Sequence, residues 1–338
     1  MRFSLLVIIC LPIAACSASN EMMPPQSDAG EAPSQTQPHN FPTGTVDGGA
    51  DRVAYPMVLC HGFTGFEKIG PISYFYGVAE ALRNDGYTVF TPVVDPYNSS
   101  EIRGAQLQAQ VQDILTKTGA NKVNLICHSQ GGLDCRYVAS NLGAHIASVT
   151  TISAPHHGTP VADIASGDLP GPVKSAVDAL LNVIGAVISN GKGDQDSAAA
   201  LAAMSSAGAA AFGRAHPDDE RVAYYSIAGR SNMASGDDTC GGATQAPFVA
   251  RWNDYLDQVD TLLSPTGSIL SNNVSPPPSN DGLIPVGSAR YGTFLGCIPA
   301  DHFDEVCQIA GDSPGNGNKF DCVLFYRQLA EYLVAHGY

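Results

Sequence analysis

Residues 124–137 read NLICHSQGGLDCRY and place Ser129 between an apolar run and two glycines. A serine at a turn from strand to helix is the nucleophile position of serine hydrolases with a G-x-S-x-G motif. Cys127 stands where that motif has its first glycine. Cysteine is small enough to strain the pattern without breaking it, but an ordinary corner containing a serine is the alternative. Catalysis also requires a base, an acid and a loop that binds an oxyanion.

The segment HGFTG, residues 61–65, fits an oxyanion-binding loop because it follows the short apolar run Met57–Cys60 directly. Acyl transfer needs two N–H donors, one beside the nucleophile and one from the loop after an earlier strand. We therefore predict that the backbone N–H groups of Phe63 and Gln130 form the oxyanion hole. A glycine-rich turn without this role is the alternative.

The base and the acid are expected after Ser129, because this arrangement runs serine, then carboxylate, then histidine along the chain. His302 lies in a loop before the last helical stretch, and Asp281 lies in a turn 21 residues earlier. A buried carboxylate would hold the imidazole tautomer and stabilise the imidazolium. We predict the triad Ser129, Asp281 and His302, which needs no organic cofactor.

Short β-rich runs alternate with helical stretches of about a dozen residues, which predicts a mostly parallel sheet with helices on both faces. This α/β class suits a nucleophile turn at the end of a strand. The expected strands are Met57–Cys60, Tyr87–Thr91, Val123–Cys127, Ser148–Ser153 and Tyr224–Ala228. The expected helices are Ile72–Asn84, Gly104–Thr118, Gly131–Leu142 and Phe320–Ala335.

An insertion at about 160–215 carries apolar residues at spacings of three and four, which predicts an amphipathic helix. A plain core helix is one interpretation, and a mobile lid whose apolar face covers a pocket is the other. Flanks rich in Gly, Asp and Ser favour the lid. Its apolar residues are Val173, Val177, Leu180, Leu181, Ile184, Val187 and Ile188.

The N-terminus has the features of an export signal followed by a tether. Residues 1–16 contain an apolar run too short to span a membrane and end in IAAC, which resembles a lipobox with Cys16 as the lipidated residue. Cleavage at small residues with an incidental cysteine is the alternative. Residues 17–50 are rich in Pro, Ser, Gln and Gly and read as a flexible tether, so the catalytic domain is expected at 51–338. We expect an exported bacterial protein, either an outer-membrane lipoprotein or freely secreted.

The net charge of the chain is −15, and this charge argues against binding to nucleic acid, whose phosphates it would repel.

Beyond Cys10 and Cys16 there are seven cysteines, so at least one is unpaired within the chain. We expect Cys60, Cys127 and Cys135 to be small buried residues. The other four can pair in three ways, of which we take Cys240–Cys297 and Cys307–Cys322 as a guess.

Several of these segments, in this order, resemble the bacterial family I true lipases of the Pseudomonas/Burkholderia type, within the α/β-hydrolases. The resemblance extends from about Tyr55 to Gly311. It implies long-chain acylglycerols bound at an interface, a lid that opens there, and for many members a dedicated foldase. The matching segments are YPMVLCHGFTG (55–65), GANKVNLICHSQGGLDCRY (119–137), SVTTISAPHHG (148–158), YYSIAG (224–229), NDGL (280–283) and HFDEV (302–306).

The resemblance also implies a structural calcium ion near His302. By position in that family's pattern, its ligands would be the side chains of Asp260, Asp304 and Gln308 and the backbone carbonyl of Asp312. Calcium binds six to eight oxygen atoms, which such groups supply. Solvated acidic loops are the alternative.

The expected function is therefore an ester hydrolase that works through an acyl-enzyme on Ser129, with triacylglycerol as the substrate. A short-chain esterase or a polyester (polyhydroxyalkanoate) depolymerase would use the same triad, because pocket shape sets acyl length. A catalytically inactive, surface-anchored binding protein is the alternative from another class. Labelling by a serine-reactive phosphonate separates it from the enzymes.

Overall fold

The computed structural model describes residues 54–65, 68, 69, 72–166, 196–231, 240, 245–272, 278–308, 311, 314, 315 and 317–338. The predicted signal segment, the tether, the apolar stripe of the lid and Asp312 lie outside these residues. Among the described residues, no helix has the length and apolar character needed to cross a membrane.

A six-stranded sheet forms the centre of the domain, and all its neighbouring strands are parallel, as predicted. The order β4-β1-β5-β6-β7-β8 places β1 and β5 side by side, so the segments that follow them meet at one edge. A separate pair, β2 (Lys68–Ile69) and β3 (Ile72–Ser73), is antiparallel. The six strands are β1 (Met57–Cys60), β4 (Val89–Phe90), β5 (Val123–His128), β6 (Ile146–Ile152), β7 (Ala223–Gly229) and β8 (Thr293–Ile298).

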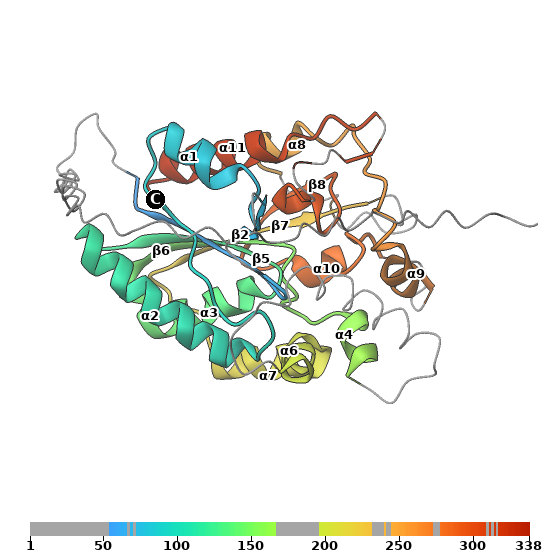
Figure 1. The fold of residues 1–338 in the computed structure, drawn as a ribbon, viewed down its shortest axis with the longest axis horizontal. Coiled ribbons are helices and arrows are strands. Elements are labelled where there is room, and N and C mark those ends of the chain that lie inside the picture. Colours follow the sequence, from blue (N-terminus) through green and yellow to red (C-terminus); the bar gives the residue numbers. More distant parts are fainter. Residues whose placement is uncertain are drawn as a thin grey trace, which may run out of the picture. The chain divides into compact units, whose positions relative to one another are not determined.

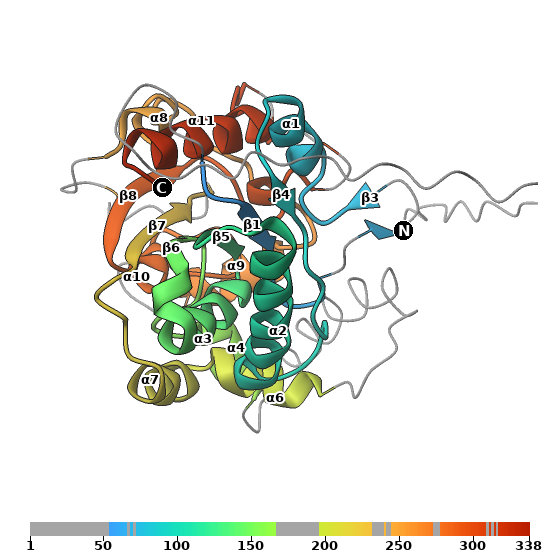
Figure 2. The same cartoon turned by 90° about the vertical axis from the view of Figure 1, so that its left-hand side faces the viewer.

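Helices cover both faces of this sheet (Figures 1 and 2). One face packs on α1 (Val78–Asn84), α8 (Pro247–Ala250) and α11 (Cys322–Ala335), and the other on α2 (Ser100–Thr118) and α3 (Gly131–Leu142). Side chains alternate between the faces along each strand. In β1, Met57 and Leu59 therefore join the first core, and Val58 and Cys60 join the second. Because both faces are covered, β1, β5 and β6 are buried at every position.

Of the predicted helices that lie within the described residues, three are confirmed, with starts that differ by at most four residues, and one is wrong over part of its length. Residues Gly131–Leu142 form α3 as predicted, and α2 begins at Ser100, where the Ser99 hydroxyl accepts the Ile102 N–H. The predicted helix Ile72–Asn84 is wrong over its first half, because α1 begins only at Val78. Gly77 precedes it with φ of 72°, a left-handed conformation that a continuous right-handed helix cannot contain.

Shorter helices lie in the insertion and in the C-terminal third. The insertion contains α4 (Pro160–Ala165), α6 (Ser197–Met204) and α7 (Ser206–Ala215). The remaining helical elements are η1 (Gly143–His145), α9 (Ser264–Asn272), α10 (Val286–Ala289) and η2 (Asp304–Val306).

Three disulfides join described residues. The guessed pairs Cys240–Cys297 and Cys307–Cys322 are confirmed. The expectation that Cys127 and Cys135 are simply small buried residues is wrong, because they form a third disulfide, while Cys60 is buried and free. An apolar environment predicts burial but does not show which buried cysteines face each other across a strand and a helix.

Candidate active site

Ser129 sits at the tight turn where β5 ends and α3 begins. Its φ of 57° is in the left-handed region, which costs a non-glycine residue about 1–2 kcal/mol, so the surrounding structure must hold it. The Ser129 N–H donates to the Ile152 carbonyl at 3.0 Å. A Cβ at Gly131 would lie 2.6 Å from the His61 carbonyl oxygen, which is why the turn needs a glycine after the serine. The strained serine is the signature of a nucleophile elbow.

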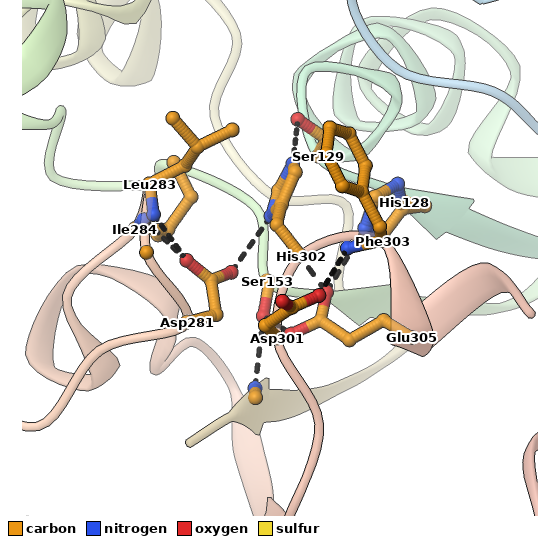
Figure 3. A network of polar contacts seen from close by, with 12 residues as sticks. His128, Ser129, Ser153, Asp281, Leu283, Ile284, Asp301, His302, Phe303 and Glu305 are labelled. Carbon is orange, nitrogen blue, oxygen red and sulfur yellow. Dashed lines mark hydrogen bonds and ion pairs between the residues drawn. The ribbon is translucent and has the colours of Figure 1, made fainter. Parts of the chain in front are cut away.

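A continuous chain of hydrogen bonds joins the three predicted catalytic residues (Figure 3). His302 Nε2 lies 2.9 Å from Ser129 Oγ, and His302 Nδ1 lies 2.7 Å from Asp281 Oδ2. The other Asp281 oxygen accepts the N–H groups of Leu283 and Ile284 at 2.8 and 2.6 Å. Asp281 is fully buried, so its carboxylate is held in one orientation by the backbone and by His302. This geometry lets His302 take a proton from Ser129.

The loop after β1 passes directly over the nucleophile. A Cβ at Gly62 would lie 2.5 Å from Ser129 Cβ, so only glycine fits there, and Phe63 is the next residue of this loop. The Gln130 side chain donates to the Asn98 carbonyl at 2.9 Å, which leaves its backbone N–H as the predicted donor. The predicted oxyanion donors, Phe63 and Gln130, therefore lie on the two segments that meet at Ser129.

A buried arginine, which the sequence analysis did not single out, holds this loop in place. Arg103, on α2, donates to the carbonyl oxygens of His61 and Gly62 at 2.9 and 3.1 Å. Its Nε also donates to Asp134 Oδ2, on α3, at 2.8 Å. Burial raises the pKa of Asp134 to about 6, and Arg103 opposes this by favouring the carboxylate. The ion pair thereby links the oxyanion loop to the helix that follows the nucleophile.

A second network of buried polar side chains lies next to His302, and the sequence analysis did not predict it. Glu305 Oε2 is 2.9 Å from His128 Nε2, and its other oxygen accepts the Ser153 hydroxyl (Figure 3). Tyr74 Oη lies 2.7 Å from His128 Nδ1. Glu305 Oε2 is also 3.8 Å from His302 Nδ1, so a second carboxyl group lies close to the catalytic ring. The HFDEV segment contains Glu305, but only the fold shows which histidines it approaches.

Burial governs the protonation of this second network. It raises the pKa of Glu305 well above its usual value, and the nearby Asp281 carboxylate raises it further. Burial also lowers the pKa of His128 well below its usual value, with the nearby His302 as the next cause. Both shifts favour a neutral Glu305–His128 pair near neutral pH.

Three carboxyl groups gather beside the loop that carries His302. Oxygen atoms of Asp257, Asp301 and Asp304 all lie within 4.8 Å of one another. Both Asp257 oxygens are buried and lack a hydrogen bond of good geometry to the described part of the chain. Burial and then the Asp301 charge raise the pKa of Asp257 to about 7. Buried carboxyl groups gathered in this way suit a hard cation with oxygen ligands.

The cluster matches the predicted calcium ligands only in part. Asp304 is in it, whereas Asp260 contributes its backbone N–H to Asp301 at 2.7 Å and its carboxylate is not in the group. The Gln308 amide nitrogen donates to the Tyr74 carbonyl at 2.8 Å. Asp257, which lies three residues before Asp260, is not among the predicted ligands. Its side chain is buried, whereas that of Asp260 is half-buried, a difference that the sequence does not show.

Comparisons with known proteins identify the family of the chain. Residues 55–171 match the family model of the alpha/beta hydrolase fold. A triacylglycerol lipase of Vibrio cholerae is 33% identical, covering 86% of this chain and 90% of its own. One of Pseudomonas fragi is 32% identical, covering 84% and 97%. The crystal structure of a metagenomic carboxyl esterase shares the fold, with a TM-score of 0.59, 18% identity and coverage of 89% and 82%. The chain therefore belongs to the bacterial triacylglycerol lipase family, within the α/β-hydrolase fold.

Proposed function

We propose that the chain hydrolyses triacylglycerol through an acyl-enzyme on Ser129. The observation that carries this proposal is the unbroken hydrogen-bond chain from Ser129 through His302 to Asp281 at a strained nucleophile turn. The named activity of the Vibrio and Pseudomonas relatives supports the substrate class.

The triad side chains and the two oxyanion-hole N–H groups each have a role in the proposed reaction. His302 Nε2 removes the Ser129 proton as Oγ attacks the ester carbonyl carbon, and the N–H groups of Phe63 and Gln130 donate to the oxyanion. His302 then gives that proton to the leaving alcohol. Water attacks the acyl-enzyme after losing a proton to His302, and the fatty acid leaves as Ser129 regains its proton. Asp281 accepts the hydrogen bond from His302 Nδ1–H throughout and stabilises the imidazolium.

The acyl length is tested with p-nitrophenyl esters from acetate to palmitate. We expect kcat/KM to be highest at eight carbons or more. A maximum at acetate or butyrate would instead support a short-chain esterase or a polyester depolymerase with the same triad. Failure of a serine-reactive phosphonate to label the folded protein would favour the inactive binding protein.

We also propose a calcium ion beside the His302 loop, with the carboxylates of Asp257 and Asp304 as ligands. The Asp257 oxygens support this position, because they are buried and have no hydrogen bond of good geometry within the described residues. The remaining predicted ligands, Asp260, Gln308 and Asp312, stay predictions. A bound cation would neutralise the clustered carboxylates and so brace the segment that carries His302, without entering the reaction.

Removing calcium is expected to lower the melting temperature by several degrees. A ligand at a hundredfold excess over its Kd stabilises the folded state by about 2.7 kcal/mol, which chelation would remove. The measurement is thermal unfolding with calcium and with EDTA. Asp257→Asn should abolish the response, whereas Asp113→Asn, at an exposed carboxylate paired with Lys117, should keep it. An identical melting temperature with and without EDTA in the unmodified protein would contradict the site.

Export is part of the proposal, with Cys16 as a lipid anchor. Three disulfides among the described residues support an oxidising compartment, and the apolar N-terminal run supports a signal segment. Metabolic labelling with a radioactive fatty acid, compared between the full chain and Cys16→Ala, tests the anchor. The foldase requirement is tested by expressing the chain with and without a lipase foldase.

A further inference from the structure

Three sulfur atoms lie together next to the nucleophile turn. Cys127 is on β5 two residues before Ser129, Cys135 is on α3, and Cys60 ends β1 just before the oxyanion loop. Their Sγ atoms all lie within 4.8 Å of one another, and all three residues are buried. Cys127 and Cys135 form a disulfide, and Cys60 is free.

The Cys127–Cys135 disulfide encloses the nucleophile turn. Its half-cystines are eight positions apart, and the residues between them include Ser129, the oxyanion donor Gln130 and the first turn of α3. The other two disulfides join positions 57 and 15 apart, and their closed segments do not contain Ser129. Among the disulfides of the described chain, this one alone ties the strand before the nucleophile to the helix after it.

A side chain fits at the position two residues before Ser129 but not at the position two residues after it. After Ser129, a Cβ at Gly131 would lie 2.6 and 2.7 Å from the backbone oxygens of His61 and Cys60, so no side chain fits. Before Ser129, where G-x-S-x-G has its first glycine, the Cys127 side chain fits between β5 and α3 and is bonded to α3. The departure from the glycine pattern therefore adds a covalent bond at the place where the backbone is strained.

We propose that the Cys127–Cys135 disulfide is a positioning element for catalysis, which holds Ser129 Oγ and the Gln130 N–H in reactive geometry. This proposal rests on the proposed role of Ser129 as the nucleophile. Small displacements of reacting groups are costly, since about 1 Å lowers a rate by about a hundredfold. A disulfide that only stabilised the fold would leave kcat of the folded enzyme unchanged.

The test compares the unmodified enzyme with Cys127→Ala/Cys135→Ala, after peptide mapping has confirmed the bond. The double change is needed because a single one would leave a thiol beside Cys60, with which it could pair. We expect kcat to fall about 10–100-fold with KM for a short p-nitrophenyl ester unchanged. Labelling of Ser129 by a small phosphonate should slow by a similar factor. Circular dichroism establishes that each variant is folded at the assay temperature.

Cys240→Ala/Cys297→Ala is the matched control, since it removes a disulfide that closes a longer segment outside the turn. It should lower the melting temperature and leave kcat and the labelling rate unchanged. If the double alanine variant does not fold, Cys127→Ala/Cys135→Val refills part of the lost volume and is measured in the same way. An unchanged kcat in a folded variant without the bond, or free thiols at both positions in the active enzyme, would overturn the proposal. Absence of hydrolysis in the unmodified enzyme would instead contradict the proposed function.

Discussion

Replacing Ser129 with alanine is expected to lower kcat by about 10⁴–10⁶-fold. The change removes Oγ, the atom that His302 Nε2 approaches to 2.9 Å, and leaves the elbow without a nucleophile. The fold should survive, because the Ser129 N–H still donates to the Ile152 carbonyl. The measurement is kcat for an ester that the unmodified enzyme hydrolyses well, with the melting temperature of both proteins.

Ser148→Ala is the matched control for this loss. Ser148 is a buried serine on β6 whose hydroxyl donates to Asn124 Oδ1 at 2.7 Å, on the neighbouring strand. Its removal leaves a buried acceptor unpaired and should cost about 1–3 kcal/mol of stability with kcat retained. Comparable turnover in the folded Ser129→Ala variant would refute the nucleophile assignment.

The catalytic chain could be predicted because its chemistry follows rules of order along the sequence. A buried run followed by two glycines identifies the elbow at Ser129 despite Cys127, and the order serine, carboxylate, histidine then selects Asp281 and His302. The structure brings these residues together across 173 and 21 positions of the chain. The start of α3 could also be predicted from the sequence, because the turn before it needs the glycines with which the helix begins.

Contacts that depend on side-chain direction could not be predicted. Glu305 meets His128 across 177 positions, and no spacing rule relates them. Asp257 and Asp260 lie in one loop, and only its backbone path decides which carboxylate joins Asp304. The Cys127–Cys135 disulfide could not be predicted for the same reason. The apolar sequence around each cysteine predicts that it is buried, but not which other cysteine its side chain faces.

Two elements of the fold were predicted with the correct residues at both ends. Strand β1 and helix α3 agree at both ends with their predicted ranges. Residues Ile72–Ser73 were misassigned because a short apolar stretch fits a helix and a strand equally well. Strand β8 (Thr293–Ile298) was not predicted, since Gly296 interrupts a run of only six residues.

Replacing Asp281 with asparagine is expected to lower kcat by about 10⁴-fold, more than replacement with alanine. The carboxylate accepts a hydrogen bond from His302 Nδ1–H, which keeps that proton on Nδ1 and leaves Nε2 free to take the proton of Ser129. An asparagine amide can donate to Nδ1 instead, which favours the tautomer with its proton on Nε2, where it blocks catalysis. Alanine imposes no tautomer, and Glu305 Oε2 is already 3.8 Å from His302 Nδ1.

The proximity of Glu305 gives the alanine variant its own pH dependence. Burial raises the pKa of Glu305, so at low pH its carboxyl group is protonated and cannot stabilise an imidazolium. Residual kcat of Asp281→Ala should therefore increase with pH until Glu305 has lost its proton, and Asp281→Ala/Glu305→Gln should lose this increase. The measurement is kcat against pH for the asparagine, alanine and double variants. An asparagine variant as active as the alanine variant would show that tautomer control by Asp281 is not what the triad requires.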